Sequence, residues 1–295
     1  MLVGVSGVLP RSRWTQRLGR VASGAICRLG ATPLVVRAQQ DGSRLLLDAR
    51  SRTEASALWL GEYEADEIAF LSTCLEPDSV VLDIGANVGL MTTPLARRLH
   101  LLGGRGRVIA FEPVPVNAER LRRNVAINHL DGRVDVVELA LGETEGRAVM
   151  VKEGPAGSSD NALVALTADS EAGGVSAELA TADSVLDEFA LERVDLVKID
   201  VEGYEVPVLR GARRLLAQHR PIVYGEFHNV LMPKRGHSFL DVWELFEPLG
   251  YHCFRFVGRC RIERVERPRY DLGNVVLVPA DRVPWLLERL SAGPS

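Results

Sequence analysis

Short aliphatic runs alternate with helix-forming segments from about residue 78 to about residue 280. The runs that are long enough for strands are Ser79–Ile84, Arg107–Phe111, Val134–Leu139, Val194–Ile199, Pro221–Gly225, His252–Val257 and Asn274–Val278. Helical patterns follow most of them, at Leu90–His100, Pro115–Leu130, Tyr204–Gln218 and Phe239–Leu249. Nearly continuous Val, Ile and Leu content is typical of parallel strands that are covered on both faces. The alternation therefore predicts one doubly wound α/β domain.

The segments outside this alternation divide the chain into three parts. Residues 1–75 are expected to form an accessory lead-in region, with short strands around Pro33–Val36 and Leu45–Asp48 and a helix from about Ala65. Residues 76–282 are expected to form the main domain, and residues 283–295 are expected to form a terminal helix and tail. Val149–Lys152 is a candidate edge strand. Glu153–Gly174, which is rich in Gly, Ser, Ala and Asp, is expected to be a long loop beside the sheet.

Charge and cysteine content narrow the classes of partner and the compartment. The 35 basic and 39 acidic residues argue against a general nucleic-acid binder, which has a basic surplus. The first thirty residues are locally basic but lack the apolar core of a signal peptide. They predict a solvated helix, with peripheral membrane contact as the alternative. No stretch approaches the roughly 20 apolar residues of a membrane span. The four cysteines are scattered, which favours free thiols and a cytoplasmic protein.

A glycine-rich turn follows the first strand of the main domain. The sequence LDIGANVG at residues 82–89 carries Gly85 and Gly89 four positions apart, and a helical pattern begins directly after them. Glycine lets a ligand approach the backbone and adopts dihedral angles that other residues avoid. The start of the following helix directs free N–H groups toward such a ligand.

The details of this turn distinguish two kinds of cofactor. The dinucleotide fingerprint GxGxxG is absent, and Asp83 precedes the first glycine by two positions. A carboxylate there suits the ammonium group of a methionine moiety better than a pyrophosphate. The turn therefore favours S-adenosylmethionine over a nicotinamide or flavin dinucleotide.

Two further strand ends supply groups for a nucleoside. Glu112 ends the second strand and can accept hydrogen bonds from both ribose hydroxyls, as acidic residues do in dinucleotide folds. The alternative is a surface carboxylate at a strand end. The third strand leads into Leu139 and Ala140, whose backbone groups are candidates for contact with the adenine edge.

Charged residues gather at the ends of the fourth and fifth strands. Alternation places Lys198, Asp200 and Glu202 on one side of the fourth strand. Ligands of open α/β sheets bind beyond the carboxyl ends of the strands, so Asp200 and Glu202 are expected to border the reaction site. Lys198 is equally compatible with a structural salt bridge. His228 follows the fifth strand and is the candidate general base, with Asp200 or Glu202 orienting it or the acceptor. A Mg²⁺ ion bridging the two carboxylates and the acceptor is the rival mechanism.

The order of these motifs resembles the FkbM-type family of S-adenosylmethionine-dependent methyltransferases. The resemblance covers about residues 60–280, and it rests on GEYE at 61–64, LDIGANVG at 82–89, AFEP at 110–113, ELALGE at 138–143, VKIDVEGYE at 197–205, VLRGA at 208–212 and GNVVLVP at 273–279. It implies a Rossmann-like class I methyltransferase fold with a seven-stranded, mostly parallel sheet whose last strand is antiparallel. It also implies O-methylation of a hydroxyl on a natural product, sugar or glycolipid.

The resemblance also assigns roles to particular residues. The residues implied to line the methionine side of the cofactor are Asp83, Gly85, Asn87 and Gly89. Glu112 would hold the ribose and Asp200 would face the methyl-transfer centre. The family's threonine-leucine-aspartate segment appears here only as TADSVLD at Thr181–Asp187, a departure that leaves the substrate side open.

Two other function classes are compatible with this fold. One is a nicotinamide-dependent oxidoreductase, which would bind NAD, and the other is a scaffold that binds a cofactor without turnover. The acceptor is expected to be a small molecule or glycan, and the sequence specifies no oligomeric state. Glu153–Gly174 and Asn229–Ser238 are the segments expected to shape the acceptor pocket.

Overall fold

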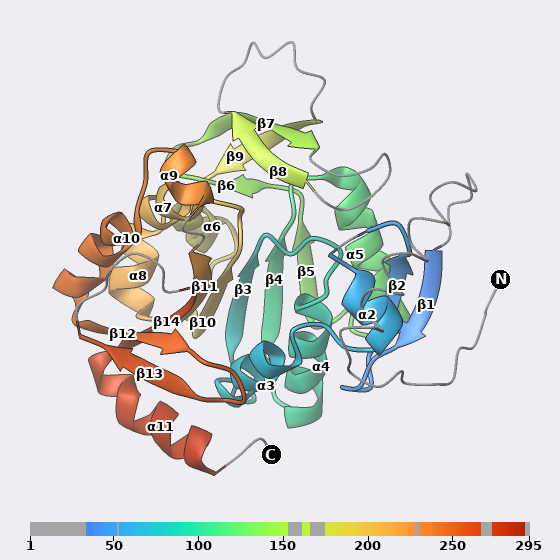
Figure 1. Ribbon diagram of the computed structural model, residues 1–295, viewed down its shortest axis with the longest axis horizontal. Coiled ribbons are helices and arrows are strands. Elements are labelled where there is room, and N and C mark those ends of the chain that lie inside the picture. The colour runs from blue at the N-terminus through green and yellow to red at the C-terminus, as the bar shows by residue number, and fades with distance from the viewer. Residues whose placement is uncertain are drawn as a thin grey trace.

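The computed structural model describes residues 34–51, 53–152, 161–165, 175–227, 230–266 and 273–292. Its centre is a sheet with the strand order β13-β12-β14-β11-β10-β3-β4-β5 (Figure 1). The strands are β3 (Val80–Ile84), β4 (Arg107–Phe111), β5 (Val134–Val137), β10 (Leu196–Ile199), β11 (Ile222–Phe227), β12 (Tyr251–Phe256), β13 (Ile262–Val265) and β14 (Gly273–Pro279). Every strand expected for this sheet is present.

The direction of the strands confirms the predicted topology. The neighbouring strands from β11 through β10, β3 and β4 to β5 are parallel. The last strand of the chain, β14, runs antiparallel to both of its neighbours, β11 and β12. The prediction of seven strands missed β13, which pairs antiparallel with β12 and forms the edge of the sheet. Its pattern of half-buried and exposed residues lacks the aliphatic run that marks the central strands.

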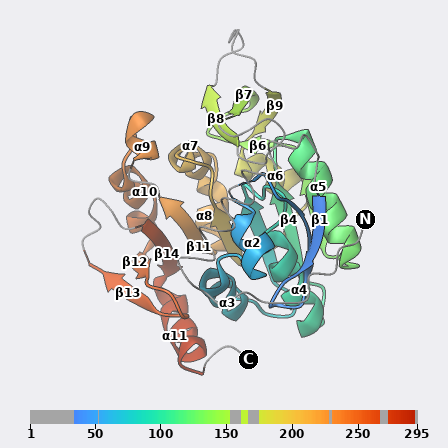
Figure 2. The same ribbon diagram turned by 45° about the vertical axis from the view of Figure 1, so that its right-hand side comes forward.

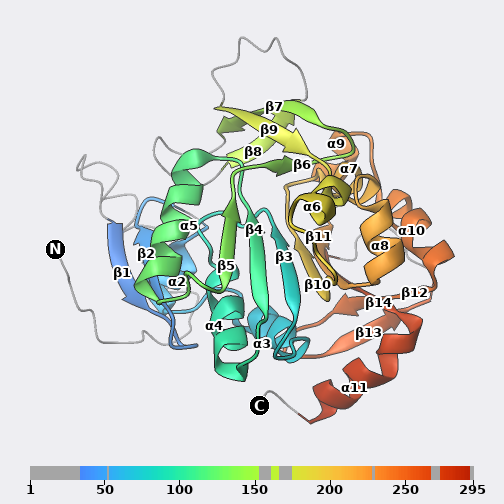
Figure 3. The same ribbon diagram turned by 180° about the vertical axis from the view of Figure 1, so that it is seen from behind.

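Helices cover both faces of the sheet, as two opposite views show (Figures 1 and 3). One face packs against α3 (Ala65–Thr73), α4 (Thr92–Leu102), α5 (Pro115–Ile127) and α11 (Val283–Ser291). The other packs against α6 (Ala182–Glu188), α7 (Glu205–Arg210), α8 (Arg213–His219) and α10 (Phe239–Phe246). Short helical turns occur at α9 (Leu231–Lys234), η1 (Glu247–Leu249) and η2 (Ala280–Arg282). Because both faces are buried, the central strands require aliphatic residues at successive positions.

The single helix predicted for Tyr204–Gln218 is in fact two helices, α7 and α8. The break falls at Gly211, where a Cβ atom would lie 1.9 Å from the backbone oxygen of Gly142. The chain from the ELALGE segment passes so close that no side chain fits there. Gly211 also accepts a hydrogen bond from the backbone N–H of Asp183, 2.9 Å away. This contact with a distant segment ends the helix, although the local pattern continues through it.

A second, four-stranded sheet lies beyond the large one (Figure 2). It contains β6 (Ala140–Leu141), β7 (Gly146–Lys152), β8 (Asn161–Ala165) and β9 (Val175–Ala180), in the order β6-β9-β7-β8. The predicted edge strand at Val149–Lys152 is therefore the end of β7, which lies between two neighbours. The prediction of a continuous loop over Glu153–Gly174 is also wrong at β8. Residues 153–160 and 166–174 lie outside the described residues.

The described part of the lead-in region is a hairpin and two helices. The strands β1 (Leu34–Ala38) and β2 (Arg44–Asp48) are antiparallel, and α2 (Ala55–Leu60) precedes α3. Both strands and α3 were predicted from the sequence, and α2 was not. The hairpin lies beside α5 in all three views. Leu45 and Leu47 of β2 share a small core with Ala57 and Leu58 of α2. The basic segment at residues 1–33 lies outside the described residues.

The remaining predictions concern thiols and membranes. Cys74, Cys253 and Cys260 are free and buried, and burial raises the pKa of Cys74 and of Cys253 to about 12. Cys27 lies outside the described residues. Within the described ranges, no helix combines the length and apolar character needed to cross a bilayer.

Candidate functional site

A cavity of about 360 Å³ opens at the carboxyl ends of the parallel strands. Its wall contains residues that directly follow β3, β4, β5 and β10, together with the end of β11. Among the predicted site residues, it is lined by Gly85, Asn87, Glu112, Leu139, Ala140, Asp200 and Glu202. Residues scattered over more than a hundred positions of sequence therefore meet in one place, at the edge where open α/β sheets bind ligands.

The glycine-rich turn forms one wall of this cavity. Gly85, Asn87 and Gly89 have φ angles of +80°, +50° and +86°. Glycine adopts such angles freely, and asparagine tolerates them better than most residues. A Cβ atom at Gly85 would lie 2.0 Å from the backbone oxygen of Asp200, and one at Gly89 would lie 2.3 Å from Leu121. Gly85 is thus required by packing as well as by dihedral angle, whereas the atom close to Gly89 is the end of a side chain.

Asp83 lies beneath the turn and does not line the cavity. Its side chain is fully buried, and it accepts a 2.5 Å hydrogen bond from the Thr92 hydroxyl at the start of α4. The Lys198 ammonium lies 3.1 Å from its other carboxylate oxygen. Any influence of Asp83 on a ligand therefore passes through Lys198 and the turn.

Lys198 joins the turn to the end of β10. It is 4% exposed, and its Nζ donates to the backbone oxygen of Gly85 at 3.0 Å and lies 3.9 Å from Asp200. Burial alone would lower the pKa of Lys198, but the carboxylates of Asp83, Asp200 and Glu64 outweigh it and raise the pKa. The salt bridge that the sequence allowed is present, and Lys198 also lines the cavity.

Glu112 stands at the end of β4 with its carboxylate 5% exposed. One oxygen accepts the backbone N–H of Asn87 at 2.9 Å, and the other accepts that of Val114 at 3.0 Å. Asn117 adds a longer contact of 3.4 Å. Burial raises the pKa of Glu112 to about 7 despite these hydrogen bonds. A carboxylate has about four acceptor positions, so it can still accept from a ligand.

The end of the cavity beside the second sheet is apolar. Leu139, Ala140 and Leu141 line it where the chain passes from β5 into β6, and Met150 of β7 closes it. Ala140 and Leu141 are buried. A flat aromatic group fits such a wall.

The turn after β10 carries Asp200 and Glu202, and both residues line the cavity. Glu202 has a φ of +53° and Gly203 a φ of +92°. Glu205 holds this turn, because its buried carboxylate accepts the backbone N–H groups of Gly203 at 3.0 Å and of Val201 at 3.3 Å. Burial raises the pKa of Glu205 to about 7. Glu205, the last residue of VKIDVEGYE, therefore stabilises the turn and does not line the cavity.

The lead-in region contributes two lining residues that the sequence analysis missed. They are Thr53, just before α2, and Tyr63, just before α3. Burial, with the charges of Glu64 and Asp200, raises the pKa of Tyr63 well above its usual value. Glu64 has a φ of +39°, and partial loss of hydration together with the charge of Asp200 raises its pKa to about 7. Only the GEYE motif hinted at this part of the site.

The remaining candidates lie elsewhere. His228 falls outside the described residues, and Gly89 lies behind the cavity wall. Of Asn229–Ser238, residue 229 is not described, and the described positions 230–238 do not line the cavity. The described side chains form no group of three or more His, Cys, Asp or Glu residues suited to a metal ion.

The segment that departs from the family pattern is structural. Thr181 caps the start of α6 by accepting the backbone N–H of Ser184 at 3.0 Å. The Asp183 carboxylate accepts the backbone N–H groups of Arg214 and Leu215 at the start of α8. Ala182, which stands in place of leucine, is buried in the core. These residues do not line the cavity, so the departure does not alter its described wall.

The sequence pattern described as "Methyltransferase FkbM domain" matches residues 83–253, more than half of the chain. Three curated relatives are similar over parts of the chain. Methyltransferase sdnD of Sordaria araneosa is 31% identical in an alignment of length 163, and the match covers 46% of this chain and 61% of that protein. The 2-O-methyltransferase NoeI of Sinorhizobium fredii is 32% identical in an alignment of length 164, and the match covers 52% of this chain and 64% of that protein. The hexuronic acid methyltransferase AglP of Haloferax volcanii is 27% identical in an alignment of length 171, and the match covers 58% of this chain and 65% of that protein.

The chain thus spans slightly less than two thirds of the length of each of these relatives. The matched residues run from Asp83, beneath the glycine-rich turn, to Cys253 in β12. They include every predicted site residue. The chain belongs to the FkbM methyltransferase domain family.

Proposed function

We propose that this protein transfers a methyl group from S-adenosylmethionine to a hydroxyl oxygen of a natural product, sugar or glycolipid. The observation that carries the proposal is a single cavity in which the glycine-rich turn, Glu112 and the charged end of β10 meet. The names of two relatives, a 2-O-methyltransferase and a hexuronic acid methyltransferase, support a hydroxyl acceptor on a carbohydrate.

The residues around the cavity fit this cofactor. The Asn87 side-chain oxygen is buried and accepts no hydrogen bond from the described residues, so it is available to the ammonium group of a methionine moiety. Glu112 has acceptor positions left for the ribose hydroxyls. The wall at Leu139 and Ala140 suits the adenine ring. The cavity volume of about 360 Å³ lies within the usual range for small-molecule sites.

The protein's contribution to such a reaction is mainly orientation. The cofactor supplies an electrophilic methyl group, and transfer is an in-line displacement that depends on the alignment of the reacting atoms. Lys198 fixes the relative position of the turn and Asp200. Asp200, Glu202 and Tyr63 line the cavity, and the charge of Asp200 acts on Tyr63, so an acceptor hydroxyl can be hydrogen-bonded beside Asp200. We place the acceptor there.

Binding of S-adenosylhomocysteine should depend on Glu112 and on its ionisation. Glu112→Ala is expected to weaken binding by at least roughly 100-fold, because two hydrogen bonds to a charged acceptor contribute about 1.5–3 kcal/mol each. The ribose hydroxyls donate to the ionised carboxylate, whose pKa is about 7 in the free protein. Affinity should therefore be full at pH 8 and fall as the pH drops through 7 toward 6. Calorimetry at several pH values measures both effects.

Glu112→Gln is the control for this experiment, because it keeps the side chain's shape but cannot titrate. Its weaker binding should vary little between pH 6 and 8. Pronounced pH dependence in this variant would assign the titration to another group, such as Glu64 or Glu205. If the folded wild-type protein bound neither S-adenosylmethionine nor S-adenosylhomocysteine, the proposed function would be wrong, and binding of NAD instead would favour an oxidoreductase.

Removal of the acceptor proton is assigned to His228, which directly follows β11. A general base contributes roughly 10²–10⁴-fold to the rate, so His228→Ala should lower kcat by that factor and leave the affinity for S-adenosylhomocysteine unchanged. Turnover should persist in excess chelator. The rival hypothesis, a Mg²⁺ ion at Asp200 and Glu202, predicts the reverse: full activity of His228→Ala and complete loss with chelator.

A further inference from the structure

Helix α5 and its C-cap residue carry a row of four polar side chains, and three of them contact the lead-in region. Asn117, Arg120, Asn124 and Asn128 follow one another at intervals of three or four residues, which places them along one side of the helix. The first three are almost completely buried. In the sequence such a row is indistinguishable from the solvated face of an ordinary helix. In the structure each member contacts backbone or side-chain groups outside α5.

Asn124 joins the glycine-rich turn to the hairpin. Its Nδ2 donates to the backbone oxygen of Val88 at 2.7 Å, and its Oδ1 accepts the backbone N–H of Leu46 at 2.6 Å. Val88 lies between Gly89 and Asn87, and Asn87 lines the cavity. Its side chain and that of Leu90 belong to the same small core as Leu45 and Leu47 of β2. Turn and hairpin are therefore connected by both polar and apolar contacts.

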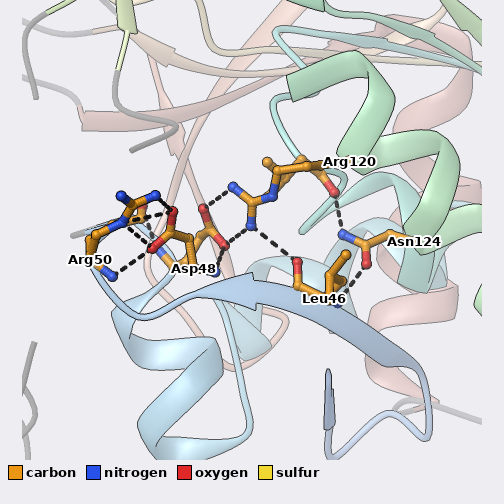
Figure 4. Close-up of polar contacts among 8 residues, drawn as sticks. Leu46, Asp48, Arg50, Arg120 and Asn124 are labelled. Atoms are coloured by element: carbon orange, nitrogen blue, oxygen red, sulfur yellow. Dashed lines mark hydrogen bonds and ion pairs between the residues drawn. The ribbon is translucent and has the colours of Figure 1, made fainter. Parts of the chain in front are cut away.

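Arg120 makes a parallel connection (Figure 4). Its guanidinium Nη2 donates to the backbone oxygen of Leu46 at 3.1 Å, and its Nη1 donates to the Glu54 carboxylate at 2.8 Å. Glu54 also accepts the backbone N–H of Asp48 at 2.6 Å. Because Thr53 directly precedes Glu54, this ion pair holds a residue of the cavity wall. Arg120 and Asn124 thus each bind a residue that adjoins the cavity wall, because Glu54 follows Thr53 and Val88 follows Asn87.

We propose that Asn124 is a positioning residue for the cofactor. Its side chain fixes the backbone of the glycine-rich turn against the lead-in hairpin. The proposal rests on the proposed cofactor site. It makes the hairpin part of that site, although β1 and β2 supply none of its lining residues. Because the side-chain amide of Asn124 holds the Val88 carbonyl, it also restricts the preceding residue, Asn87, whose backbone N–H donates to Glu112.

Asn128 provides a matched control. It forms the same two kinds of hydrogen bond with the same strand, accepting the backbone N–H of Arg44 at 2.8 Å and donating to its carbonyl oxygen at 2.6 Å. Unlike Asn124, it makes no contact with the turn among the hydrogen bonds of the described residues. A comparison of Asn124→Ala with Asn128→Ala therefore separates fixing the turn from anchoring the hairpin.

The test is calorimetric titration of the full chain with S-adenosylhomocysteine. Asn124→Ala should bind at least tenfold more weakly than the wild type, with unchanged stoichiometry, and Asn128→Ala should stay within twofold. A merely structural role would lower the fraction of folded protein, and hence the stoichiometry, at unchanged Kd. If Asn124→Ala does not fold, Asn124→Ser replaces it, because serine leaves a polar group at this position. This variant should also bind at least tenfold more weakly than the wild type.

Two outcomes would overturn the inference. Wild-type affinity in the folded Asn124 variant would show that the turn needs no fixing by α5. Equal weakening in the Asn128 variant would show that the hairpin, and not the turn, is what matters. Failure of the proposed function itself gives a different result, because the wild-type protein would then bind no S-adenosylhomocysteine.

Discussion

Lys198→Met should lower the free energy of unfolding by about 3–5 kcal/mol, the usual loss when one partner of a buried ion pair is removed. The variant leaves the fully buried Asp83 carboxylate without its cation, and the Gly85 carbonyl without its donor. A residual carboxylate in that position must be protonated or rehydrated. Urea denaturation of the two proteins at pH 7 measures the difference.

Two further variants show whether the loss arises from the unpaired charge. Adding Asp83→Asn to Lys198→Met removes that charge and should recover a large part of the stability. Lys234→Met, at an exposed position, should change the free energy of unfolding by no more than about 0.5 kcal/mol. A loss in the double variant equal to that in Lys198→Met would show that the packing of the lysine stem, and not the ion pair, is what stabilises the turn.

Gly85→Ala should abolish cofactor binding and destabilise the fold by several kcal/mol. The new Cβ atom would lie 2.0 Å from the Asp200 carbonyl oxygen, and backbone atoms cannot move aside as a flexible side chain does. The turn and the end of β10 must separate, and this displaces the groups that line the cavity at Gly85 and Asp200. Denaturation and calorimetry with S-adenosylhomocysteine measure the two effects.

Gly250→Ala is the matched control, because Gly250 has a similar φ of +70° but no atom within 4 Å of the position of its Cβ. It should cost only the roughly 1–2 kcal/mol of the left-handed conformation and leave binding unchanged. Equal destabilisation by the two alanines would mean that the dihedral angle alone, and not the close approach of Asp200, requires glycine at residue 85.

Local patterns in the sequence predicted most of the main sheet. The central strands are buried on both faces, so each needs an uninterrupted aliphatic run, and such a run is visible without knowledge of its neighbours. The edge strand β13 has no such requirement and was missed. The glycine-rich turn was visible for a similar reason, because its left-handed angles restrict residue type at Gly85 and Gly89 themselves.

The site was predictable where it depends on strand ends. The carboxyl ends of parallel strands meet at one edge, so Glu112, Leu139 and Asp200 could be placed together from sequence alone. Tyr63 and Thr53 could not, because they come from a region with no strand in the large sheet. The single GEYE motif gave no direction for their side chains.

Other features were decided only by tertiary contacts. The break at Gly211 depends on the passing backbone of Gly142, and the burial of Asp83 depends on Lys198, more than a hundred residues away. The polar row on α5 has the spacing of a solvated helix face, and only the structure shows that the hairpin covers it. Periodicity reports which side of an element is buried, whereas hydrogen bonds between distant segments depend on how the elements pack. In this protein the sequence by itself determined the central strands of the sheet, the glycine-rich turn and the family, and the packing of the lead-in region on α5 decided how the cavity is completed.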